Sequence, residues 1–144
     1  MFLRIVMATL AAAASFGVQA ASGWVALSGA NSETTFINRS SIHTQGQFVD
    51  VEVLRDFAET VTLGNDPQSG TPLYTHRSVT LSYRVDCSTN TLAMSEWQMF
   101  EKNLGQGALV WNQNNVTGLA FLPAVDAEMR AVLRSACATT TVSR

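Results

Sequence analysis

The stretch from Arg77 to Cys87, Arg-Ser-Val-Thr-Leu-Ser-Tyr-Arg-Val-Asp-Cys, decides the fold. Its apolar residues and its cysteine fall on alternate positions: Val79, Leu81, Tyr83, Val85 and Cys87. This period of two predicts a β-strand with one buried face. The thiol of Cys87 is therefore expected to point into the core. The outward side chains, which a partner could contact, are expected to be Arg77, Thr80, Ser82 and Arg84.

The start of the chain has the pattern of a secretory signal peptide over residues 1–20. Arg4 is followed by an apolar run from Ile5 to Val18 and by a small residue, Ala20, at the expected cleavage position. The alternative is a membrane anchor, but an apolar run of about 14 residues falls short of the ~20 that a spanning helix needs. We therefore expect an exported protein without a membrane span after cleavage.

Removing 20 of the 144 residues leaves residues 21–144, which is enough for a single domain with a hydrophobic core. Loss of Arg4 leaves eight basic residues against eleven acidic ones, spread along the chain without a basic cluster. This charge pattern gives no reason to expect a nucleic acid partner or an anionic membrane surface.

The chain has two cysteines, Cys87 and Cys137. In an exported protein such a pair predicts one disulfide, because the compartments beyond the inner membrane are oxidising. The alternative is a nucleophilic cysteine, but no activating motif surrounds either residue. His43 and His76 are too isolated for a metal site, and each is expected to lie in a solvated loop or at a strand edge.

Other short apolar or alternating segments predict further strands: residues 24–28, 34–37, 48–57, 108–111 and 116–122. Ala58 to Leu63 either extends the strand that precedes it or begins another. Gly64 to Pro72 collects glycine, proline and asparagine, so it predicts a surface loop.

The segment from Thr91 to Lys102 is ambiguous, because its residues are good helix formers. A tight turn at Ser88-Thr89-Asn90 nevertheless favours a strand antiparallel to the one before it. In that strand one face would carry Ala93, Ser95, Trp97 and Met99.

From Ala124 to Ala138 the period becomes helical, with an apolar stripe made of Val125, Met129, Val132, Leu133 and Ala136. Cys137 lies at the edge of this stripe, and Thr139 to Arg144 is expected to be a frayed tail. The predicted fold is of the α+β class: a small antiparallel β-sheet of about six strands, with a C-terminal α-helix packed on it and one disulfide.

The sequence contains no phosphate-binding loop, nucleophile elbow or metal-spaced cluster, so we expect no enzyme activity and no cofactor. The acidic pairs Asp50/Glu52 and Asp126/Glu128 are better explained as solvated faces than as catalytic carboxylates. Of the three tryptophans, Trp24, Trp97 and Trp111, at least two are expected to pack in the core. The residues alone therefore predict a secreted binding or structural module.

The order of these motifs resembles the surface-adhesin protein E family. The matching parts are Trp24-Val25, Thr35 to Asn38, Val49 to Val53, Tyr74 to Cys87, and Pro123 followed by a helix that ends in Cys137. The resemblance implies a non-enzymatic protein in the periplasm or on the outer surface of a Gram-negative bacterium. It also implies binding to host proteins or homodimerisation in some members. No binding residue of the family maps onto this chain. Ala124-Val125-Asp126 departs from the glycine and Ser/Thr that often follow the proline.

The alternative function is that of a periplasmic inhibitor of c-type lysozyme. Ser28-Gly29-Ala30-Asn31 lacks the tyrosine of one motif of the membrane-bound inhibitors, and Tyr74 is not followed by the Thr-Lys-Gly of the other. The expected partner is a protein, either a host extracellular protein or lysozyme.

Overall fold

The computed structural model describes residues 23–30, 32–115 and 117–138. The predicted signal peptide and the predicted tail from Thr139 lie outside these residues. The described chain forms one antiparallel sheet, one α-helix and a short 3-10 helix, η1. Their bounds are β1 Trp24–Ala30, β2 Glu33–Gln45, β3 Phe48–Asn65, β4 Pro72–Asp86, β5 Thr91–Phe100, η1 Asn103–Gly105, β6 Leu109–Asn114, β7 Leu122–Pro123 and α1 Ala127–Ala138.

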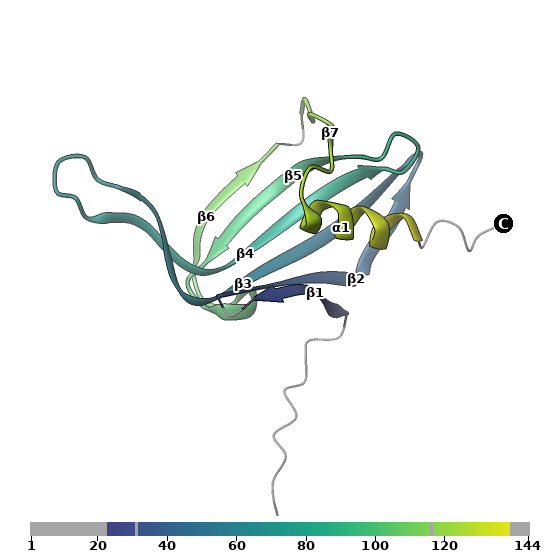
Figure 1. The fold of residues 1–144 in the computed structure, drawn as a ribbon. Helices are drawn as coiled ribbons and strands as arrows, with labels where there is room; N and C mark the ends of the chain where they lie inside the picture. Colours follow the sequence, from purple (N-terminus) through teal and green to yellow (C-terminus); the bar gives the residue numbers. More distant parts are fainter. Residues whose placement is uncertain (1–22, 31, 116, 139–144) are drawn as a thin grey trace, which may run out of the picture.

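The sheet has the simplest antiparallel topology, because β1 to β6 lie side by side in chain order. The two-residue strand β7 pairs with the beginning of β5. Figure 1 shows α1 lying across one face of the sheet, over its middle strands. The α+β class, the antiparallel sheet and the C-terminal helix predicted from the sequence are thus confirmed.

The alternation in β4 builds the centre of the core. Val79, Leu81, Tyr83 and Val85 are all buried. The valines of β3 are their cross-strand neighbours: the register pairs Val49 with Val85, Val51 with Tyr83 and Val53 with Leu81. The helix α1 adds Val132 and Ala136 to the same core. Burying a side chain of this size stabilises the fold by about 1.5–3 kcal/mol. A slip of one residue in β4 would expose all four.

A disulfide and a group of side-chain hydrogen bonds attach α1 to the sheet. Near its C-terminus, Cys137 forms the predicted disulfide with Cys87, which directly follows β4. Near its N-terminus, both oxygens of the Glu128 carboxylate accept hydrogen bonds from the sheet. Arg55 donates from Nε at 2.9 Å and from Nη2 at 2.7 Å, and the Thr35 hydroxyl donates at 2.9 Å. Glu128 is therefore tied to the sheet. The prediction that it belongs to a solvated face was wrong.

The helix begins later than predicted, at Ala127. Asp126 sets this start, because its carboxylate accepts a 2.7 Å hydrogen bond from the backbone N–H of Met129 and so caps the first turn. Pro123 pairs with Thr91 in β7. Val125 is 73% exposed, so its assignment to the buried stripe was wrong.

Thr91–Phe100 is a strand, as predicted, in spite of its helix-forming residues. The prediction of its faces was wrong, because the β4–β5 register shifts between Ser82 and Tyr83. Beyond that shift Met94 packs against the core with Trp97. Ser95 and Glu96 lie on the opposite face of the sheet.

Three other predicted boundaries also change. The strand predicted at residues 34–37 continues to Gln45, because an irregularity in its pairing absorbs the polar residues after Asn38. The predicted strand at 108–111 continues to Asn114. Most of the described part of 116–122 is not a strand; the stacking of Phe121 on Phe48, with ring centroids 5.2 Å apart, holds this segment to the sheet.

Ala58 to Leu63 extends β3, which was one of the two alternatives. Beyond Phe57, β3 has no pairing with β2 and pairs with β4 alone. Residues 58–76 therefore form a two-stranded hairpin arm that projects from the sheet (Figure 1). At its tip the Asp66 carboxylate accepts hydrogen bonds from the backbone N–H groups of Gln68 and Ser69 at 2.9 and 2.8 Å.

Candidate functional site

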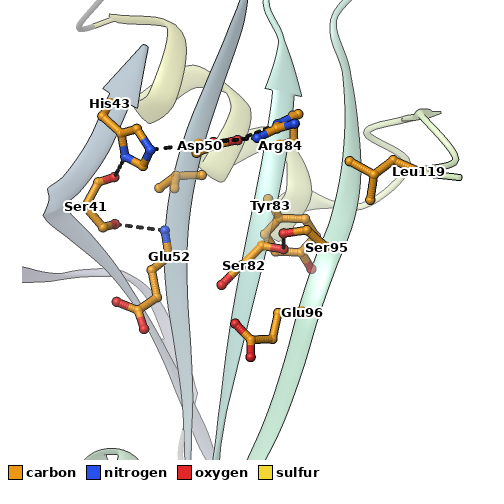
Figure 2. A pocket seen from close by; sticks show the side chains of 11 residues that line it. Ser41, His43, Asp50, Glu52, Ser82, Tyr83, Arg84, Ser95, Glu96 and Leu119 are labelled. Carbon is orange, nitrogen blue, oxygen red and sulfur yellow. Dashed lines mark hydrogen bonds and ion pairs between the residues drawn. The ribbon is translucent and has the colours of Figure 1, made fainter. Parts of the chain in front are cut away.

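A hollow of about 400 Å³ lies on the sheet face opposite α1 (Figure 2). We call it the polar hollow. Side chains of β2, β3, β4 and β5 form most of its lining: Ser41, His43, Asp50, Glu52, Ser82, Arg84, Ser95 and Glu96. Because no helix of the described residues covers this face, these groups remain within reach of a partner.

An ion pair between neighbouring strands crosses one side of the polar hollow. Asp50 and Arg84 are cross-strand partners in the register of β3 and β4. Arg84 donates from Nε to Oδ1 at 2.7 Å and from Nη2 to Oδ2 at 2.8 Å, which is a bidentate geometry. The hydrogen bond from Arg84 lowers the pKa of Asp50 below its usual range. Both charges are therefore held in fixed positions at neutral pH.

A break in the pairing of β2 shapes the hollow next to Asp50. The β2–β3 register jumps between Asn38 and His43, so the intervening residues have no cross-strand partner. The Ser41 hydroxyl fills the gap: it donates to the carbonyl of Asn38 at 2.7 Å and accepts from the backbone N–H of Glu52 at 2.9 Å. His43 returns towards the sheet, with its Nε2 atom 3.5 Å from Asp50. Such irregularities re-aim side chains beside binding sites.

The register shift between β4 and β5 shapes the other side. Ser95 donates from its hydroxyl to the carbonyl of Ser82 at 3.1 Å, so a serine again satisfies a backbone group at an irregularity. The same shift turns Glu96 into the polar hollow, where its carboxylate accepts a 3.0 Å hydrogen bond from Gln98. Figure 2 shows Glu96 and Glu52 projecting on the same side.

Loops cover both ends of this face. At one end the η1 loop covers Ser78, whose hydroxyl accepts a 2.9 Å hydrogen bond from the backbone N–H of Gly105. At the other end Leu119 lines the polar hollow, and Phe121 stacks on Phe48. Among the described residues, the polar hollow therefore lies between these two covering segments.

The polar hollow offers fixed hydrogen-bonding groups and an excess of carboxylates. Asp50, Glu52 and Glu96 contribute three acidic groups, of which Arg84 neutralises one. In the described ranges no group of three or more His, Cys, Asp or Glu side chains could hold a metal ion. This arrangement suits recognition of a polar, partly cationic surface by groups that lose little freedom on binding.

Two of the four side chains predicted to face outward from β4 line the polar hollow, namely Ser82 and Arg84. Thr80 shares their face and contacts Gln98. Arg77 is different: it is partly buried at the base of the hairpin arm, where it donates to the carbonyl of Ala58. No binding residue could be named from the sequence.

His43 is exposed, as predicted, but the prediction for His76 was wrong. His76 is only 4% exposed and contacts the edge of the Phe57 ring, with centroids 5.7 Å apart. Trp97 and Trp111 pack against the core in a T-shaped pair, with centroids 5.0 Å apart. This confirms that at least two tryptophans have a packing role.

In the described part of the chain, no helix has the length and apolar character needed to cross a membrane. A search of curated proteins found no match. Among solved structures, the chain resembles Haemophilus influenzae protein E. Crystal form II of that protein has 16% sequence identity and a TM-score of 0.59, and the alignment covers 85% of this chain and 93% of that one. A structure of protein E from a non-typeable strain has 16% identity and a TM-score of 0.61, with 88% and 83% covered.

These likenesses concern the fold, because the identity is low. The family assignment comes from a separate finding: the family model described as surface-adhesin protein E matches residues 24–138. That span contains the whole sheet, the disulfide and α1. The chain therefore belongs to the surface-adhesin protein E family.

Proposed function

We propose that this protein is an exported, non-enzymatic adhesin-type module that binds a protein partner of the host or of the cell envelope. The mature chain would be residues 21–144, a single domain in the periplasm or on the outer surface of a Gram-negative bacterium. Family membership supports the adhesin class. The observation that carries the proposal further is the polar hollow, where fixed charged and hydroxyl groups lie on the sheet face opposite α1.

The hollow is preorganised by the backbone rather than by flexible loops. The hydroxyls of Ser41 and Ser95 each hydrogen-bond a backbone group at an irregularity, and Asp50 and Arg84 hold one another. Side chains that are already ordered cost less entropy on association, which favours a polar interface with a partner. A partner surface with lysines or arginines would complement Glu52 and Glu96.

The test uses purified residues 21–144 and immobilised mammalian basement-membrane extract, with binding followed by surface plasmon resonance. Glu96→Lys reverses a charge inside the polar hollow. The control, Glu101→Lys, makes the same change at an exposed residue that does not line it. We expect the first variant to weaken binding about tenfold or more, and the second to leave it within about twofold, as for rim charges away from an interface.

Equal effects of the two variants would contradict a role for the polar hollow. If the wild-type protein binds nothing in the extract, the host-protein arm of the proposal fails and an envelope partner must be sought. The same protein is then added to c-type lysozyme acting on a bacterial suspension. Inhibition at an equimolar ratio would favour the alternative function. Sedimentation of the purified protein decides whether it forms a homodimer.

A further inference from the structure

A second recess lies on the helix-bearing face of the sheet, between α1 and the base of the hairpin arm. Its volume is about 410 Å³. We call it the apolar groove. Its walls are Phe57, Val61, Leu63, Met94, Trp97 and Met129, and its floor consists of buried residues of β4 and β5.

The groove exists because α1 is too short to cover the sheet. A 12-residue helix is roughly 18 Å long at ~1.5 Å per residue, whereas the part of β4 within the sheet, residues 77–86, spans roughly 33 Å at ~3.3 Å per residue. Figure 1 shows the hairpin arm leaving the sheet at the end away from α1. The apolar face therefore continues beyond the helix.

The floor of the groove lies below the surrounding surface. Val79, Leu81 and Met99 line it, yet none is more than 6% exposed. A flat protein surface could not reach these side chains, but a slender chain could. The volume falls within the range of roughly 300–1,000 Å³ that is usual for small-molecule sites, and so does the mainly apolar lining with a few polar groups.

Two polar groups at the groove lack partners. The indole Nε1 of Trp97 and the ring Nδ1 of His76 are buried and make no hydrogen bond within the described residues. Trp97 can only donate, so its missing partner is an acceptor. Burial lowers the pKa of His76, which keeps the ring neutral near pH 7. A buried donor without an acceptor is destabilising, and a bound oxygen would relieve this cost.

We propose that the apolar groove binds a small amphipathic molecule, with an acyl-type chain on the floor and an acceptor oxygen that pairs with Trp97 or His76 after a small side-chain rotation. This site is on the opposite face from the polar hollow and does not depend on the proposed adhesin function. The chain would contact the buried residues of β4 and β5, and the lip of the groove would be formed by Leu63.

The probe is sodium decanoate, titrated calorimetrically into purified residues 21–144 below its micelle concentration. The chain offers a matched pair of variants on the hairpin arm. Leu63 is 41% exposed and lines the groove, whereas Leu73 is 52% exposed and does not. We expect saturable binding at one site, weakened about tenfold by Leu63→Asp and left within about twofold by Leu73→Asp. Trp97→Phe, which removes only the donor and part of the ring, should weaken binding about fivefold.

Absence of saturable binding would overturn the proposal, and so would equal effects of the two leucine variants. Sedimentation adds a further check. If the protein is a dimer that Leu63→Asp dissociates, and decanoate does not bind, then a second copy covers the groove and the proposal is wrong. Circular dichroism and urea midpoints for each variant confirm that lost binding does not reflect unfolding.

Discussion

The disulfide should account for a large part of the stability of this domain. Cys87 and Cys137 are 50 residues apart. In the chain-entropy model, closing a loop of this length stabilises the fold by about 4 kcal/mol, between the ~3 of a 15-residue loop and the ~4.7 of a 100-residue loop. Typical domains have only 5–15 kcal/mol in total. Replacing both cysteines by alanine should therefore lower the free energy of unfolding by about 4 kcal/mol.

Urea unfolding followed by tryptophan fluorescence measures this change. With a denaturant slope of about 1.5 kcal/mol per M, the midpoint of the double variant should fall by more than 2 M relative to the oxidised protein. Reduced wild-type protein is the control and should match the variant. A midpoint shift below about 0.5 M would refute the reasoning, because it would mean that the cross-link does not restrict the unfolded chain.

Three further changes test the packing and electrostatics. Val85→Asp buries a charge at a position with 0% exposure, so soluble yield and melting temperature should fall sharply; an unchanged melting temperature would refute the placement. Glu128→Gln weakens the ion pair between α1 and Arg55. Because Arg55 is 37% exposed, we expect the free energy of unfolding in urea to fall by only about 1 kcal/mol, and an increase would contradict a stabilising role for this pair. His76 has its pKa lowered from 6.5, so the unfolded chain takes up the proton first and stability should fall as the pH drops below 6.5, levelling off below the folded pKa. His76→Phe should flatten this dependence between pH 7.5 and 5, whereas an identical slope would exclude His76 as its source.

The parts of the fold that could be predicted depend on strong local patterns. The alternation in β4 identified the inward residues, and Cys87 among them pointed to the disulfide with Cys137. The turn after Asp86 outweighed the helix propensity of Thr91–Phe100, since cross-strand pairing overrides a weak local preference. What could not be predicted depends on irregularities: one register shift in the β4–β5 pair puts Ser95 and Trp97, which were predicted to share a face, on opposite faces of the sheet.

The polar hollow was harder to predict, because it depends on register between strands far apart in sequence. A usable signal did exist: Asp50 and Arg84 occupy polar positions of two strongly alternating strands and carry opposite charges, which favours direct pairing. Nothing in the sequence predicted that Ser41 lines the polar hollow, because its position follows from the interrupted β2 pairing. His76 resembled a solvated residue in the sequence, since nothing local shows that Phe57 and the arm will bury it.

The most direct test of the central claim is site-specific photocrosslinking on the two faces of the protein. A photoreactive amino acid replaces Gln98, beside Glu96 on the sheet face opposite α1, or Arg130, which is exposed on the helix. Each protein is then incubated with the basement-membrane extract in which the proposed function expects a partner. The account predicts a crosslinked partner from position 98 that Glu96→Lys abolishes, and none from position 130. Crosslinking from position 130 alone would contradict it.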